Sequence, residues 1–105
     1  MNVVEDEVYA LVEKERANCL DTYGPLHSGH EGYAVVKEEI EETHEELDRV
    51  EQGLESLWED LRFNDPDGCI VDAKEAKEAA IRCACEAIQA AAVFSRILDV
   101  LEATT

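Results

Sequence analysis

Residues 29–61 read GHEGYAVVKEEIEETHEELDRVEQGLESLWEDL, and this stretch decides the fold. Mostly apolar residues recur in it every three or four positions and form a seam, which is the spacing of one face of an α-helix. The residues of this seam are Tyr33, Val36, Ile40, Thr43, Leu47, Val50, Leu54, Leu57 and Leu61. The pattern predicts a long helix from about Gly29 to Leu61 with a narrow, coiled-coil-like seam.

Helix starts are indicated three times by a capping residue with Glu three positions later. The pairs are Asn2 with Glu5, Ser28 with Glu31, and Asp72 with Glu75. We expect a first helix over about 3–21, which ends before the Gly24-Pro25 dipeptide. We expect a third helix over about 73–103, and the turn-forming residues 64–68 reverse the chain before it.

The third helix is apolar over a wide arc, with many alanines that allow close packing. The predicted fold is therefore all-α, a three-helix chain with two long antiparallel helices. A hairpin of this kind exposes apolar surface unless another chain covers it. We therefore expect a helical bundle assembled as a homodimer or homotetramer.

The chain has 105 residues, which is the length of one domain, and we treat 1–105 as a single domain. Hydrophobic residues make up 46%, as in a soluble globular protein. No apolar run is long enough to cross a membrane, and the first residues lack the pattern of a signal peptide. We expect a cytoplasmic protein without a membrane partner.

The formal charge of −17 opposes binding to anionic polymers, so nucleic-acid polymers are excluded as partners. The acids concentrate between residues 31 and 60, where Glu39 and Glu42 lie one helical turn apart on the same side. The third helix offers Glu86 and, three residues on, Gln89, within a mainly apolar stretch. Carboxylate oxygens that would otherwise repel suit Mg²⁺ or Mn²⁺. The alternative is that the acids form an ordinary solvated face.

Glu38-Glu39-x-x-Glu42 followed by Glu86-x-x-Gln89 resembles the signature of the MazG-like all-α nucleoside triphosphate pyrophosphohydrolases, which is Glu-Glu-x-x-Glu and then Glu-x-x-Asp. Residues 23–33 and 86–92 look like small phage and prophage MazG-related proteins, and the resemblance covers roughly residues 15–99. Gln89 replaces the family's Asp.

The resemblance implies Mg²⁺-dependent hydrolysis of a (d)NTP to the nucleoside monophosphate and pyrophosphate. It implies that Glu39, Glu42 and Glu86 are metal ligands and that Gln89 supplies a carbonyl ligand or holds a metal-bound water. Glu38 is a candidate catalytic base in this scheme.

A basic cluster and one histidine are candidate phosphate contacts. Lys74 and Lys77 form a cluster with Arg82 near the predicted start of the third helix, and His30 lies at the start of the second. Ion pairing with acids of the second helix is the alternative for the cluster.

Two other functions fit the same residues. The first is a catalytically degenerate relative that binds nucleotide or metal, with Gln89 marking the loss of hydrolysis. The second is an acidic helical assembly module without catalysis. Whether Glu39, Glu42 and Glu86 converge in space discriminates between a site and a solvated face.

Overall fold

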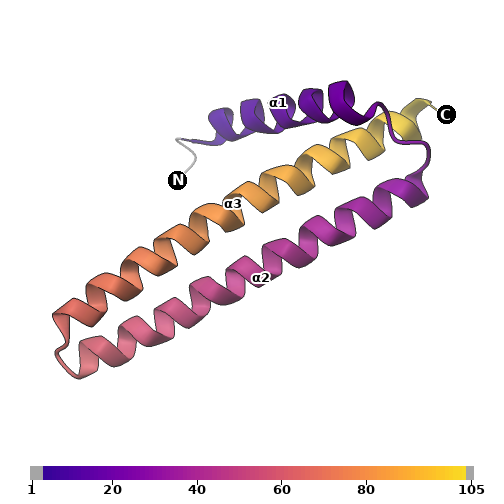
Figure 1. Ribbon diagram of the computed structural model, residues 1–105. Coiled ribbons are helices and arrows are strands. Elements are labelled where there is room, and N and C mark those ends of the chain that lie inside the picture. The colour runs from indigo at the N-terminus through magenta and orange to yellow at the C-terminus, as the bar shows by residue number, and fades with distance from the viewer. Residues whose placement is uncertain (1–3, 104–105) are drawn as a thin grey trace. The chain divides into compact units, whose positions relative to one another are not determined.

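The computed structural model describes residues 4–103, and this part of the chain is helical without a β-strand. The helices are α1 (Glu5–Tyr23), α2 (Gly29–Arg62) and α3 (Pro66–Ala103) (Figure 1). The predicted all-α fold with two long helices is confirmed. None of the described helices has an apolar stretch long enough to cross a membrane.

The described chain divides into two compact units. Unit 1 contains α1, the part of α2 up to Ile40 and the part of α3 from Glu86 onward, and unit 2 is Glu41–Cys85. Helices α2 and α3 contribute to both units, and within each unit they pack against each other in antiparallel directions.

Unit 1 has a small apolar core in which Val36 of α2 packs with Ala90 and Val93 of α3. Close approach of the two helices depends on Gly32, because a Cβ there would collide with the side chain of Ile97. Val36 belongs to the seam predicted for α2, whereas Gly32 does not, and Tyr33 of the same seam is exposed.

Helix α1 is joined to α3 in unit 1 by Arg16, whose Nη2 lies 2.6 Å from Oδ2 of Asp99 and whose Nε lies 3.2 Å from the same oxygen. Both donors converge on one carboxylate oxygen, and the hydrogen bonds are charge-assisted. The Asp99 carboxylate raises the pKa of Arg16 further above its ordinary value, and Glu13 adds to the effect. The cation therefore stays charged at every physiological pH.

Unit 2 is a helical hairpin in which small residues set the distance between α2 and α3. A Cβ added to Gly53 would lie 2.8 Å from Cβ and 3.3 Å from Cα of Ala76. Deeper along the hairpin, the Cys83 thiol donates to the carbonyl of Thr43 at 3.7 Å. The hairpin is packed tightly enough that a single methyl group at Gly53 has no room.

The reversal between α2 and α3 is shorter than predicted, because α3 begins at Pro66 and not near Ala73. Asp65 accepts a hydrogen bond from the Gly68 N–H at 3.1 Å, which is the geometry of a helix N-cap. Proline is favoured at the first helical position, where its missing N–H costs nothing. Asp72, predicted as the cap, lies inside the helix, so that prediction is wrong.

The other helix ends lie close to their predicted positions. The Ser28 hydroxyl accepts from the Glu31 N–H at 3.1 Å, which confirms the predicted cap of α2. Helix α1 extends to Tyr23 and then stops at Gly24, which has a φ of 73°. The predicted cap at Asn2 lies outside the described residues.

Candidate metal centre

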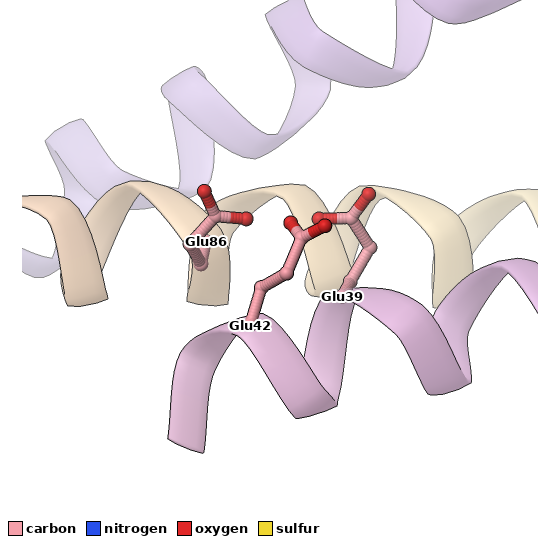
Figure 2. Close-up of side chains that lie close together, drawn as sticks. All are labelled: Glu39, Glu42 and Glu86. Carbon is pink, nitrogen blue, oxygen red and sulfur yellow. The ribbon is translucent and has the colours of Figure 1, made fainter. Parts of the chain in front are cut away.

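Three carboxyl groups meet where α2 passes α3. Each of Glu39, Glu42 and Glu86 offers one oxygen, and these oxygens lie within 4.8 Å of one another (Figure 2). Glu39 and Glu42 come together because three residues on a helix make about one turn. Glu86 comes from α3, and it is half-buried like Glu39, whereas Glu42 is exposed. These are three of the four residues predicted as ligands.

Gln89, the fourth, also reaches this cluster. When its amide is oriented to donate, the nitrogen lies 3.0 Å from Oε2 of Glu39 and 3.1 Å from Oε2 of Glu86. The amide nitrogen and oxygen exchange places when the end of the side chain rotates, so the same position can also hold a carbonyl oxygen. Gln89 can therefore neutralise part of the repulsion between the two acids or act as a neutral oxygen ligand.

The donor set is made entirely of oxygen, which Mg²⁺ and Mn²⁺ prefer over nitrogen and sulfur sites. Two oxygens on opposite sides of one Mg²⁺ lie about 4.2 Å apart, because each bond is about 2.1 Å long. Neighbouring oxygens around an octahedral Mg²⁺ lie about 3.0 Å apart, so the three carboxyl groups, now within 4.8 Å of one another, would have to turn inward to hold the cation. The residues thus fit a hard divalent cation.

The remaining predicted site residues are not among the three clustered acids. Glu38 is exposed, and on a helix it points about 100° away from Glu39. His30 is exposed at the start of α2 in unit 1, and Lys77 is exposed on α3 in unit 2. Lys74 lines an open cavity of about 550 Å³ in unit 2.

Glu46, which follows Glu42 by four residues on α2, forms ion pairs with two arginines. Its Oε2 accepts from Arg82 Nε at 2.9 Å, and its Oε1 pairs with Arg49. The side chain of Glu46 is only 12% exposed, so both bonds are partly shielded from water. The ion pairing predicted for the basic cluster is therefore present at Arg82.

A cavity of about 470 Å³ in unit 1 was not anticipated from the sequence, and it is called the unit 1 cavity below. Glu39 and Gln89 of the metal centre form part of its lining. Leu26, Val35 and Val93 provide its apolar walls. A pocket of this volume is in the range that binds small organic ligands.

Arg96 is the most unusual residue of the unit 1 cavity. It is 7% exposed, and its Nη2 donates to the carbonyl of Gly24 at 3.1 Å. Its Nε is buried and has no hydrogen-bond partner in the structure, and Arg96 forms no ion pair among residues 4–103. An unpaired buried donor typically costs about 1–3 kcal/mol. The sequence could have indicated this residue, because Arg96 is the one charged side chain in the stretch 90–98.

The carboxylates around the unit 1 cavity also affect Cys19 of α1, which lines it. Burial raises the pKa of the Cys19 thiol, and the neighbouring Glu15 raises it further. Arg96 acts in the opposite direction, and Glu39 adds a small increase. Cys19 is therefore a neutral thiol at pH 7 and not an activated nucleophile.

Comparison with known proteins does not assign the chain to a family. No family model, curated protein or solved structure matches it.

Proposed function

We propose that the protein is a Mg²⁺-dependent (d)NTP pyrophosphohydrolase. The observation that supports this most strongly is the convergence of oxygens from Glu39, Glu42 and Glu86 within 4.8 Å. A solvated acidic face would leave such groups dispersed, because like charges repel. The sequence resemblance to MazG-like proteins names the reaction that a centre of this kind performs.

In this proposal Glu39, Glu42 and Glu86 hold the cation and Gln89 contributes its carbonyl oxygen. Bound Mg²⁺ or Mn²⁺ would offset the charge of the triphosphate and lower the pKa of a water. Attack of a water oxygen on the α-phosphorus would break the bond between that phosphorus and the oxygen that bridges it to the β-phosphate. Pyrophosphate leaves with that bridging oxygen, and the nucleoside monophosphate remains.

Glu38 has a secondary role in the proposal. Its exposed carboxylate lies next to Glu39 in the chain, and we assign it the role of accepting the proton released by the attacking water. The cations of unit 2, Lys74 among them, supply positive charge to an otherwise acidic surface.

A second candidate function is binding without turnover, and a specific observation favours it. The Gln89 amide donates to both Glu39 and Glu86 when oriented to do so, which satisfies the acids without a cation. An amide also carries no charge, so it holds a divalent cation less strongly than the carboxylate of an Asp would. A degenerate nucleotide-binding or metal-binding protein would have these features.

The deciding experiment is to incubate the purified protein with each (d)NTP and Mg²⁺ or Mn²⁺ and to follow pyrophosphate and monophosphate. We expect release that Glu39→Gln and Glu86→Gln each reduce at least about a hundredfold, the scale of losing a metal-binding group. Glu41→Gln is the matched control, because Glu41 is exposed on α2 and lies outside the cluster. Equal loss in all three variants would contradict the assignment.

The native protein distinguishes the two functions. Nucleotide or Mn²⁺ binding without pyrophosphate release would reject hydrolysis and support the second candidate function, binding without turnover. Gln89→Asp then tests the reason, because it restores the family's acid and should produce turnover.

We further propose that the protein assembles as a homo-oligomer, because part of the apolar surface of α2 is left uncovered by the other described residues, 4–103. Ile40, Leu47, Leu54 and Leu61 are spaced by seven residues and are all exposed. Such a row is typical of a helix that packs against another helix. Light scattering tests this directly: Leu47→Glu and Leu54→Glu should yield monomers, whereas Glu51→Gln on the same helix should not.

A further inference from the structure

We propose that the unit 1 cavity binds a nucleobase that carries an amino group, with Arg96 donating a hydrogen bond to an acceptor atom of the ring. This inference rests on the proposed function, because the unit 1 cavity shares Glu39 and Gln89 with the metal centre. It adds to that function the chemical class of the ligand and the residue that recognises it.

Arg96 provides the first argument. A buried guanidinium normally satisfies its donors with carboxylates or carbonyls. Arg96 has one such bond, to the carbonyl of Gly24, while its buried Nε remains without a partner. Since Arg96 also lines the unit 1 cavity, an acceptor atom on a ligand there would give the guanidinium a further hydrogen bond once the side chain turns a donor toward the ligand.

The charges around the unit 1 cavity decide between a base and a phosphate group. Glu15, Glu31 and Glu39 all line it, against the single cation of Arg96. Three carboxylates repel a phosphate group, whereas a neutral ring carries no net charge to be repelled. The same carboxylates accept hydrogen bonds, so they favour a ring with an exocyclic amino group.

The walls of the unit 1 cavity suit a flat ring. Leu26 and Val93 are buried, and Val35 is half-buried beside them. Tyr23, also in the lining, is 78% exposed and therefore free to pack its ring on a bound base. Apolar faces with a few polar groups at the edge are typical of sites for planar ligands.

The unit 1 cavity lies next to the metal centre, as a base site would lie next to the phosphate site of a nucleotide. Glu39 and Gln89 belong both to its lining and to the group of polar side chains around the metal centre. A nucleotide with its base in the unit 1 cavity would therefore have its phosphates near oxygens that hold a cation. The base and the phosphates would be recognised by different residues.

The test uses nucleosides in EDTA, so that neither a metal nor a phosphate group contributes. Methyl NMR signals of Leu26, Val35 and Val93 report on the unit 1 cavity, and those of Val50 in unit 2 serve as the internal control. Cytidine and adenosine should shift the three cavity signals saturably and leave Val50 unchanged. Uridine and inosine, which carry a carbonyl in place of the amino group, should bind at least about tenfold more weakly, since a buried group would be left unpaired.

Arg96→Met keeps the apolar stem and removes the donor, and it should weaken cytidine binding about tenfold or more. Arg62→Met is the matched control, because Arg62 is exposed at the end of α2 in unit 2. Tyr23→Ala is a second variant that does not depend on the bond from Arg96 to Gly24. It removes an exposed ring and should also weaken binding.

Several results would overturn the inference. They are the absence of cavity shifts with any nucleoside, equal binding of cytidine and uridine, and shifts caused by pyrophosphate that disappear in Arg96→Met. The outcome is separable from hydrolysis. Nucleoside binding in a protein without turnover would support the base site and reject the enzyme, whereas turnover without nucleoside binding would reject only the base site.

Discussion

Gln89→Glu changes the charge of the metal centre at constant side-chain length. With its amide oriented to donate, Gln89 places its nitrogen 3.0 Å from Oε2 of Glu39 and 3.1 Å from Oε2 of Glu86. The substitution replaces this double donor with a fourth carboxylate beside Glu39, Glu42 and Glu86, and such a group of like charges is unfavourable unless it takes up a proton. We expect the variant to be less stable than the native protein without metal, and to gain more stability from Mg²⁺.

Two limits set how much free energy of unfolding Gln89→Glu loses without metal. A hydrogen bond to a charged group contributes about 1.5–3 kcal/mol, so losing two would cost about 3–6 kcal/mol. Protonation of the cluster limits this cost, because a carboxyl group of ordinary pKa near 4.3 can be kept protonated at pH 7 for about 3.7 kcal/mol. We therefore expect a loss of about 3–4 kcal/mol at pH 7, less if the half-buried cluster is well hydrated.

The loss should depend on pH with a defined sign. The folded variant holds a proton that the unfolded chain releases, so the introduced carboxyl group has a raised pKa in the folded state. Such a group is not destabilising below its unfolded pKa of about 4.3, and the folded state loses stability as the pH rises above that value. The native protein has no equivalent titration at residue 89.

Urea unfolding at pH 4 and pH 7, in EDTA and with Mg²⁺, measures these effects. Mg²⁺ at a hundred times its dissociation constant would return about 2.7 kcal/mol. Gln52→Glu is the control, because Gln52 is an exposed glutamine on α2. If both variants lose the same free energy of unfolding in EDTA, Gln89 does not bridge the acids. If Mg²⁺ stabilises neither the native protein nor the variant, the cluster does not bind Mg²⁺ and the proposed metal site is rejected.

Three further substitutions test the packing and the turn of unit 2. Asp60→Asn should stabilise the protein near pH 7 and have little effect near pH 4. A hydrogen bond with Asp72 is the main reason that the pKa of Asp60 is raised, and desolvation is the second. The folded native protein therefore loses stability as the pH rises through that range, and the Asn variant does not. Urea unfolding at the two pH values measures the difference. Gly53→Ala should destabilise by about 1–3 kcal/mol despite the better helix propensity of alanine, because the new methyl group collides with Ala76, and the loss is measured as a shift in the urea midpoint. Asp65→Ala should cost about 1 kcal/mol by removing the cap of α3, measured by thermal unfolding followed by circular dichroism.

Each of these has a matched comparison. Asp48→Asn on the exposed side of α2 should show no pH-dependent gain, and a gain equal to that of Asp60→Asn would refute the raised pKa of Asp60. Adding Ala76→Gly to Gly53→Ala should recover part of the loss, since it removes the colliding methyl group. Asp67→Ala changes an acid in the same first turn of α3 without removing the cap, and a loss as large as that of Asp65→Ala would argue against the N-cap.

The start of α3 shows the limit of prediction from local residue types. Asp65 and Pro66 are typical of turns, and they are equally typical of the cap and first position of a helix. The left-handed conformation of Asn64, with a φ of 53°, completes the reversal earlier than the sequence suggested. The same residue types thus fit a loop or a helix start, and the surrounding hairpin decides between them.

The sequence by itself determined the helical fold and the ridge of Glu39 and Glu42, because a helical period depends only on residues that are close in the chain. The tertiary structure decided the rest of the site. Glu86 meets Glu39 only because small residues such as Gly32 let α3 approach α2 in one register. The unpaired donor of Arg96 likewise arises from the packing of distant segments, and no local pattern encodes it.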